Sequence, residues 1–326
     1  MRRSDSGELV VSSSPHRWAG ITTTAIMRDV LIALTPAALG AIYLFGWRAG
    51  VVICLSIIAA LVTEWGCQRL MNKAVTIADG SAVITGLLLA FNLPPTVPFW
   101  LPVVGSVFAI AIVKQAFGGL GRNFVNPALA ARAFLLAAWP AAMTTWTSPF
   151  DAVTTATPLA LLPRPVGPAP EATGPLPSYL DLLTGSVGGS LGETSALLLL
   201  LGAVYLLWKG IIDWKVPAGF LGTMAVLAWA LGGGQGLFSG DPVYHVLSGG
   251  AILGAFFMAT DYVTIPLTPN GRWIFGIGCG LITMLVRLYG GYPEGVSYSI
   301  LIMNVAAPLL DRFTVPVPFG GVKRHA

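Results

Sequence analysis

Runs of apolar residues constrain this chain most strongly, because it carries ten of them and each can form a transmembrane helix or half of one. The runs are continuous rather than alternating, which argues against β-strands, and an open sheet edge is not viable in lipid. Only 10% of the residues are charged, whereas a soluble domain has about 25%. The sequence therefore predicts an all-α polytopic membrane protein with about ten transmembrane helices. The runs cover residues 29–46, 50–69, 80–93, 98–115, 126–140, 193–208, 216–232, 242–259, 273–288 and 296–310.

Lysine and arginine residues set the orientation of these helices, because such residues concentrate in cytoplasmic loops. With a cytoplasmic N-terminus, fourteen of them fall on the cytoplasmic side and three on the outer side. This topology puts both termini in the cytoplasm and the connection between the fifth and sixth runs outside. The basic residues form no run that could bind a phosphate backbone, so we expect the lipid bilayer as a partner and no nucleic acid.

The two halves of the chain contain short matches in the same order: Gly40–Leu44 with Gly202–Leu206, Gly80–Ile84 with Gly249–Leu253, and Gly118-Gly119 with Gly290-Gly291. Five apolar runs lie in each half, so the second half would be inverted in the membrane relative to the first, as in several transporter folds. The sequence thus predicts two inverted five-helix repeats. The predicted segments are 1–27 (cytoplasmic), 28–140 (first repeat), 141–192 (outer loop), 193–311 (second repeat) and 312–326 (cytoplasmic tail).

The third and eighth runs are short and are bordered by Gly and Pro. The third ends at Asn92-Leu-Pro-Pro95, and the eighth ends at Thr260-Asp261. Short, interrupted segments in corresponding places of two repeats indicate half-helices with a binding site at the repeat interface. Alternatively, they reflect only the higher frequency of Gly and Pro in membrane helices.

The outer loop is rich in Pro, Thr, Ser and Gly and contains the stretch Asp151-Ala-Val-Thr-Thr-Ala-Thr157. Its spacing, D-x-x-[S/T]-x-A-T, resembles the signal that flavin transferases read when they link FMN to a threonine. On this interpretation Thr157 carries a covalent flavin, and Asp151, Thr154 and Ala156 are the recognition positions. The alternative is a solvated loop, since Thr and Ser are common wherever chains turn.

A second candidate site lies at the cytoplasmic entry to the fifth run, in residues 117–130. Gly118 and Gly119 allow close approach of the backbone and positive φ angles. Asn123 and Asn126 are three residues apart, so their amides face one side if a helix begins early enough. Paired amides offer donors and acceptors to the edge of a flavin or quinone. Ordinary capping is the alternative, because Asn126-Pro127 resembles a helix start.

Few ionisable residues lie within or at the ends of the apolar runs, and such residues are often functional. Arg132 lies in the fifth run, where it either serves a site or extends to the membrane surface. Asp261 ends the eighth run, and three roles stay open for it: capping the following turn, binding a cation, or orienting a cofactor. Glu64 lies five residues before Arg69, which predicts an ion pair, and His245 is expected to be structural. The three cysteines are isolated, which argues against an iron–sulfur cluster held by this chain.

Three stretches together resemble the D-type membrane subunits of Rnf complexes and, more distantly, the B-type subunits of the sodium-pumping NADH:quinone oxidoreductases. They are F-G-G-L-G-R-N-F-V-N-P-A from Phe117, D-A-V-T-T-A-T-P-L from Asp151, and F-F-M-A-T-D from Phe256. The resemblance covers nearly the whole chain. In this family the flavinylation signal usually has Gly before the final Ala-Thr, where this chain has Thr155.

The resemblance implies a fold of ten helices in two inverted halves, related to urea transporters. It implies FMN joined to Thr157 through a phosphoester on the outer side, and a second, non-covalent flavin (riboflavin) near Asn123 and Asn126. The family's complex passes electrons from reduced ferredoxin to NAD+ and drives Na+ or H+ outward across the cytoplasmic membrane of bacteria or archaea. The implied partners are the A, B, C, E and G subunits of that complex and a flavin transferase for maturation.

Two other functions fit the residues alone. Inverted repeats with paired broken segments also suit a channel or carrier for a small solute, which needs no cofactor. A structural assembly protein with a vestigial site is the third possibility. If the chain is instead the Rnf-type subunit, it works as part of an oxidoreductase complex rather than as an enzyme by itself.

Overall fold

The computed structural model describes residues 22–151, 153–162, 175–233, 236–290 and 294–316. Within these ranges every regular element is a helix, apart from one isolated bridge between Thr147 and Thr154. The prediction of an all-α fold is therefore confirmed. The α-helices are α1 (Thr23–Phe45), α2 (Trp47–Leu70), α3 (Ser81–Phe91), α4 (Trp100–Val107), α5 (Pro127–Ala138), α6 (Pro140–Met143), α7 (Tyr179–Thr184), α8 (Ala196–Trp208), α9 (Lys215–Leu231), α10 (Pro242–Leu247), α11 (Ala251–Leu253), α12 (Pro269–Tyr289) and α13 (Val296–Thr314).

Four further helical segments differ from the α-helix in their hydrogen bonding. Two are short 3-10 turns, η1 (Ile77–Asp79) and η3 (Pro158–Leu161). The other two are π-helical, η2 (Phe108–Gln115) after α4 and η4 (Gly254–Met258) after α11. Segments of π-helix are rare and frequently lie at functional sites.

The apolar helices make this chain a membrane protein. Three of them, α1, α2 and α12, are long and apolar enough to cross a membrane, and α3, α5, α8, α9 and the α4–η2 pair are shorter apolar helices. Large apolar side chains cover the outside: Leu70 is 86% exposed, Trp208 81% and Tyr43 76%. Such a surface is unfavourable in water by about 25 cal/mol per Å² of apolar area, whereas lipid tails accept it.

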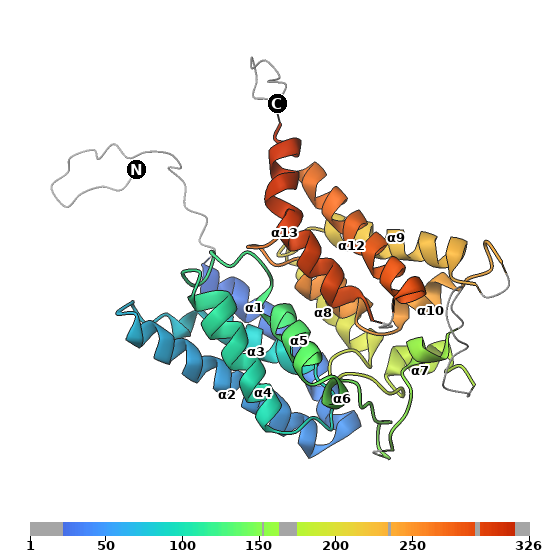
Figure 1. Cartoon of the computed structure of the whole chain (residues 1–326), viewed down its shortest axis with the longest axis horizontal. Helices are drawn as coiled ribbons and strands as arrows, with labels where there is room; N and C mark the ends of the chain where they lie inside the picture. The colour runs from blue at the N-terminus through green and yellow to red at the C-terminus, as the bar shows by residue number, and fades with distance from the viewer. Residues whose placement is uncertain (1–21, 152, 163–174, 234–235, 291–293, 317–326) are drawn as a thin grey trace.

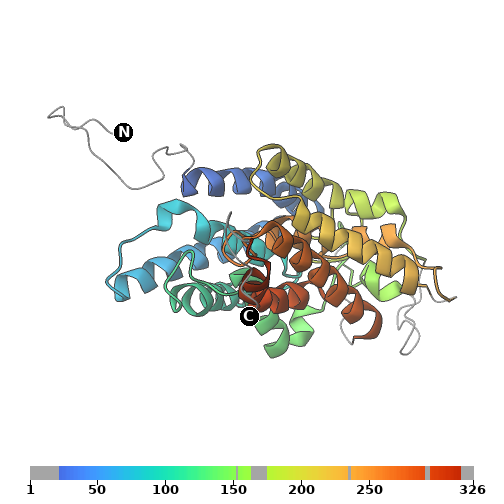
Figure 2. The same ribbon diagram turned by 90° about the horizontal axis from the view of Figure 1, so that it is seen from above.

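The helices form two groups, with α2 to α5 on one side, α9 to α13 on the other, and α1 and α8 between them (Figure 1). α1 packs against α8, and Figure 2 shows these two helices side by side. Glycines allow this close approach: a Cβ on Gly202 would lie 2.1 Å from the Ala33 carbonyl oxygen, and one on Gly40 would lie 2.3 Å from Leu198 Cδ1. Small residues at crossings let helix backbones approach closely within a membrane.

The third and eighth runs form short helices, in line with the Gly and Pro residues at their borders. Gly80, with φ of 81°, precedes α3. The eighth run is divided into α10 and a second piece, α11 with η4, by a turn in which Gly249 has φ of 65°. Both angles favour glycine. The C-terminal ends of α3 and η4 meet, because Asn92 Nδ2 lies 3.7 Å from Met258 Sδ.

Glu64 does not pair with Arg69, so this prediction was wrong. The two residues are five positions apart, which places them on different faces of α2, whereas side chains that meet along a helix are three or four apart. Glu64 lies on the buried face at 1% exposure and contacts Lys114 Nζ at 2.8 Å. Arg69 lies on the exposed face.

Candidate functional site

A narrow turn carries the predicted flavin-linking stretch. Backbone hydrogen bonds of 2.8 and 3.0 Å fold residues 146–155 back on themselves. Asp151 and Thr154, two of the predicted recognition positions, are exposed on this turn, and Ala156 is half-buried. Ala152 lies outside the described residues. Surface loops of this kind are accessible to modifying enzymes.

Thr157 differs from its neighbours because it is only 9% exposed. It precedes η3, and its side chain makes no capping hydrogen bond there. Thr157 lines a small cavity together with Gly188, Gly189, Glu193 and Glu294. We call this cavity the outer pocket.

The outer pocket has features of a site for a polar group. The Ser190 hydroxyl, next to its glycine wall, is buried without a hydrogen-bond partner, and Glu193 Oε1 makes no hydrogen bond but lies 3.5 Å from the Arg132 guanidinium. Buried polar atoms are usually satisfied, by protein, water or a ligand. A Cβ on Gly188 would lie 2.3 Å from Thr155 Cγ2, so glycine lets this wall approach the turn that leads to Thr157. These features fit a polar group attached at Thr157.

Arg132 is the centre of a buried charged cluster beside the outer pocket. Its guanidinium contacts Glu294 and lies 3.5 Å from Glu193 Oε1. It also donates hydrogen bonds to Asn92 Oδ1 at 3.2 Å and to Ser297 Oγ at 2.7 Å. At 4% exposure Arg132 does not extend to the membrane surface, so the snorkelling interpretation was wrong.

His245 lies beside a second buried arginine. Arg287 donates to His245 O at 2.5 Å and to Ser248 O at 3.2 Å, which stabilises the turn between α10 and α11. The His245 imidazole is buried, and both its nitrogens lack a hydrogen-bond partner. No group of three His, Cys, Asp or Glu that could hold a metal occurs in the described residues. The backbone carbonyl of His245 thus has a structural role, and the role expected for its imidazole stays a prediction.

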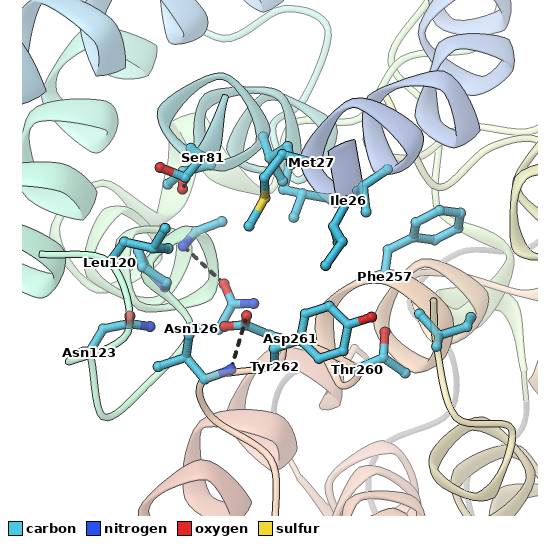
Figure 3. Close-up of a pocket in the computed structure, with 18 of the residues that line it drawn as sticks. Ile26, Met27, Ser81, Leu120, Asn123, Asn126, Phe257, Thr260, Asp261 and Tyr262 are labelled. Atoms are coloured by element: carbon cyan, nitrogen blue, oxygen red, sulfur yellow. Dashed lines mark hydrogen bonds between the residues drawn. The ribbon is translucent and has the colours of Figure 1, made fainter. Parts of the chain in front are cut away.

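A second cavity, which we call the inner cleft, lies at the N-terminal end of α5. It is lined by Ser81, Lys114, Asn123, Asn126 and Asp261 together with apolar side chains, and Figure 3 shows the two asparagines and Asp261 across from Ser81. Its cavity volume is about 110 Å³, which is below the range of about 300–1,000 Å³ typical of complete small-molecule sites. The fold thus brings together three polar residues that the sequence singles out in two separate motifs.

Asn126 both caps a helix and lines the inner cleft. Its Oδ1 accepts hydrogen bonds from the first amides of α5, so the capping interpretation is confirmed. Its Nδ2 donates to Met258 O at 3.3 Å. Gly118 and Gly119 have φ of 121° and 101°, angles that favour glycine, and they turn the chain from η2 toward Asn123.

Asp261 caps the turn after η4. One carboxylate oxygen accepts from Val263 N at 3.5 Å and the other from Thr264 Oγ1 at 3.4 Å. Of the three roles open for this residue, capping is confirmed. Orientation of a cofactor stays a prediction, and the position of Asp261 in the wall of the inner cleft is compatible with it.

Beside the inner cleft lies a buried ion pair that the sequence motifs do not indicate, and one of its members, Lys114, lines the cleft. Lys114 Nζ lies 2.8 Å from Glu64 Oε1 and donates to Ser81 Oγ at 2.6 Å. Gln115 Nε2 donates to the same Glu64 oxygen at 2.7 Å. Lys114 ends an apolar run, where a basic residue ordinarily indicates topology alone. Only 10% of this chain is charged, so each charged residue at the edge of an apolar run is a candidate for a functional role. Lys114 could have been found by this criterion, together with several other residues.

Comparison with known proteins identifies the family. The model described as the NQR2, RnfD, RnfE family matches residues 10–320. The chain belongs to this family. The resemblance indicated by the three sequence stretches is therefore confirmed over nearly the whole length.

Curated members of the NQR2, RnfD, RnfE family match this chain from end to end. It is 56% identical to the D subunit of the Na(+)-translocating ferredoxin:NAD(+) oxidoreductase complex of Acetobacterium woodii, over 97% of this chain and 96% of that protein. It is 50% identical to the D subunit of the proton-translocating ferredoxin:NAD(+) oxidoreductase complex of Clostridium ljungdahlii, over 95% and 96%. The D subunit of the ion-translocating oxidoreductase complex of Halorhodospira halophila is 37% identical, over 96% of both chains.

Proposed function

We propose that this chain is the D-type membrane component of an Rnf-type complex, in which electrons pass from reduced ferredoxin to NAD+ and drive Na+ or H+ outward. The observation that carries the proposal is the identity of 56% and 50%, over nearly the full chain, to the D subunits of two ferredoxin:NAD(+) oxidoreductase complexes. One relative is named for Na(+) and the other for protons, so the proposal covers both ions. The A, B, C, E and G subunits are then its partners in the cytoplasmic membrane.

The proposed architecture is ten membrane segments in two inverted five-helix repeats, related to urea transporters. Helix contacts support it: α2 packs against α3 and α4 as α9 packs against α10 and α12, and α5 contacts α13 between the halves. The matched glycines Gly80 and Gly249 also share a positive φ. In this topology the termini lie in the cytoplasm, the outer pocket faces the outside and the inner cleft faces the cytoplasm.

At the outer pocket the proposed group is FMN, linked by a flavin transferase to Thr157 through a phosphoester. The D-x-x-T-x-A-T stretch, its exposed turn and the buried Ser190 hydroxyl, which has no hydrogen-bond partner next to the glycines of the outer pocket, support this assignment. When bound, FMN supplies the capacity to accept and release electrons. The residues of this chain anchor it, shield one side of the link and set the charge around it. A covalent link suits a water-facing site, because a flavin held by its phosphate alone would dissociate.

The inner cleft is proposed to hold a second, non-covalent flavin, for which riboflavin is the candidate. The amides of Asn123 and Asn126 and the carboxylate of Asp261 provide donors and acceptors for a ring edge. Apolar side chains from α1, including Met27 and Val30, line the same cleft and suit the ring faces. Two such sites, one at the N-terminal end of α5 and one beside Arg132 in its middle, would give electrons part of a route across the membrane.

The covalent flavin is tested by the intact mass of the chain, expressed together with its flavin transferase and purified. We expect the mass to increase by one FMN and the band on a denaturing gel to fluoresce. Thr157→Ala should remove both signals, whereas Thr155→Ala should keep them, because the D-x-x-[S/T]-x-A-T spacing accepts any residue at a position where the family usually has Gly and this chain has Thr. A bare wild-type chain, or fluorescence that survives Thr157→Ala, rejects the assignment.

The inner flavin is tested on the flavin released when the protein is denatured, since the covalent link stays intact. Asn123→Ala removes one amide, and Asn126→Ser removes the other while it keeps an N-cap residue. We expect both variants to lose the released flavin and to keep the covalent one. As a control, Thr283→Val removes a buried hydrogen bond between α12 and α13 and should retain both. Unchanged release from both asparagine variants would place the second flavin elsewhere.

A small-solute channel or carrier is the competing function, suggested by the two short helices that meet at Asn92 and Met258. Liposomes that contain this chain alone separate the two. Solute flux through a protein without flavin supports the channel, and bound flavin without flux supports the electron carrier. A vestigial structural protein would be colourless and would show no flux.

A further inference from the structure

Arg132 connects the outer pocket to the middle of the molecule. On one side it contacts Glu294 and lies 3.5 Å from Glu193, and both carboxylates line the same cavity as Thr157. On the other side it donates to Asn92 Oδ1, at the end of α3. Arg132 and Asn92 are 4% and 1% exposed, so solvent screens these contacts very little.

The same row of contacts continues to the inner cleft. Asn92 Nδ2 approaches Met258 Sδ at 3.7 Å, and Met258 O accepts from Asn126 Nδ2 at 3.3 Å. Asn126 lines the inner cleft. Buried polar contacts thus join the two cavities through the point where α3 and η4 meet.

The proposed repeats place a neutral residue at the position equivalent to Arg132. In the proposed repeats Arg132 corresponds to Asn304, at the same offset that relates the Gly-Gly pairs before α5 and α13. Asn304 Oδ1 accepts from the Asn126 backbone amide at 3.1 Å, as Arg132 contacts Ser297 near the start of α13. A neutral amide completes the crossing of α5 and α13 on one side. The equivalent residue on α5 is Arg132, and it lies where two carboxylates line the same cavity as Thr157.

We propose that Arg132 is an electrostatic positioning residue for the redox group at the outer pocket. Its positive charge offsets the negative charges of Glu193 and Glu294 beside Thr157. Through Asn92, a change of charge at the outer pocket also changes the redox potential of the group in the inner cleft. This inference rests on the proposed function, because it takes Thr157 as the attachment point of a flavin. Each electron taken up at the outer pocket adds negative charge, which the Arg132 guanidinium favours and the Glu193 carboxylate opposes.

The size of the effect is estimated from Coulomb's law for an assumed separation. A full charge about 10 Å away, at an effective dielectric constant of about 20, changes an equilibrium constant on the order of tenfold. A tenfold change in a one-electron equilibrium is about 59 mV in midpoint potential. This is large enough to be measured by redox titration.

The experiment is a spectroscopic redox titration of the Thr157-linked flavin in the purified full chain. Arg132→Asn, which introduces the residue found at the equivalent position, should lower the midpoint potential by about 59 mV. Glu193→Gln should raise it by a similar amount. Opposite signs identify charge as the cause, because damage to packing has no reason to shift the two variants in opposite directions. The non-covalent flavin of the inner cleft should shift in the same sense as the outer one, by less.

Two controls separate charge from structure. Arg132→Lys keeps the charge and should hold the outer potential near that of the wild type, although lysine cannot make all four contacts. Thr283→Val removes a buried hydrogen bond to Ser299, and neither residue lines either cavity, so this variant should leave both potentials unchanged. If Arg132→Asn fails to fold, the other two variants still test the proposal. Arg132→Lys should leave the midpoint potential unchanged, and Glu193→Gln should raise it.

Each outcome supports or overturns the proposal. Equal potentials in the wild type, Arg132→Asn and Glu193→Gln overturn it, while the flavin on Thr157 stands. An outer shift without any change at the inner cleft overturns the link through Asn92. A Thr157 that carries no flavin overturns this proposal together with the proposed covalent FMN, and the intact mass of the chain distinguishes that result from a flavin whose potential does not shift.

Discussion

The buried ion pair between Glu64 and Lys114 gives a sharp test of the packing around the inner cleft. Lys114 Nζ and Glu64 Oε1 are 2.8 Å apart, and the side chains are 2% and 1% exposed. Each ion has therefore lost its hydration and depends on the other. Removal of one partner leaves a buried, unpaired charge, which destabilises a protein by about 3–5 kcal/mol.

The surroundings of each ion decide where a variant falls in that range. Without Lys114, Glu64 Oε1 still accepts from Gln115 at 2.7 Å and from Gln68 at 3.4 Å, so Lys114→Met should lower the unfolding free energy by about 3 kcal/mol. Without Glu64, the ammonium keeps the Ser81 hydroxyl as a partner, so Glu64→Leu should reach about 4–5 kcal/mol. The double variant replaces the pair with apolar side chains, and its stability should return to within about 1–2 kcal/mol of the wild type, on either side.

The assay is unfolding of the purified protein in mixed micelles with a rising fraction of denaturing detergent, followed by circular dichroism and analysed by linear extrapolation. Lys209→Met is the matched control: Lys209 pairs with Asp29 at 3.6 Å but is 42% exposed, and such pairs contribute about 0–1 kcal/mol. The reasoning is refuted if the double variant is as unstable as Glu64→Leu. It is refuted equally if both single variants are no less stable than Lys209→Met.

Two further predictions concern packing and pH. Gly202→Val should force α1 and α8 apart and destabilise the protein by about 1–3 kcal/mol. Gly222→Ala should stabilise it by about 0.5–1 kcal/mol, because a Cβ at that position would meet nothing within 4 Å. Thermal unfolding in detergent measures both effects. Burial raises the pKa of Asp213 in the loop after α8, but hydrogen bonds from Arg272 and Lys215 outweigh this and hold its pKa below the ordinary value. Its stabilising contribution is thus complete above about pH 4 and is lost as the pH falls through the folded pKa. Arg272→Gln should flatten this acid limb of a stability–pH profile, and an unchanged limb would contradict the assignment.

The positions of the helices follow closely from the sequence, because a continuous apolar run has few alternatives in lipid. The predicted run 50–69 is α2, and 216–232 is α9. The break inside 242–259 is harder to locate, since apolar residues continue on both sides of it and Gly249 alone has the φ that marks the turn. Periodicity cannot detect such a break, because a helix buried all round has no polar face to interrupt.

At the candidate sites, the sequence identifies individual residues, whereas only the fold shows which of them lie together. Asn123, Asn126 and Asp261 stand out in the sequence because polar residues at the edge of apolar runs are conspicuous, but the fold alone shows that they line one cleft. The partners of buried charges cannot be read from spacing. Glu64 pairs across helices with Lys114 rather than along its own helix with Arg69, and long-range pairs of this kind depend on which helix faces meet.

The distribution of buried charge supports a link between the two cavities. Ionisable groups inside a membrane protein are costly, and an amide at Asn304 completes the helix crossing without one. The charges nevertheless gather beside the cavities, with Arg132, Glu193 and Glu294 at the outer pocket and Lys114 with Glu64 at the inner cleft. In a medium of low dielectric constant a fixed charge acts over a long distance. Since Arg132 alone of these residues also contacts Asn92, where the two short helices meet, loss of its charge should disturb both cavities, whereas loss of Lys114 should disturb mainly the inner cleft.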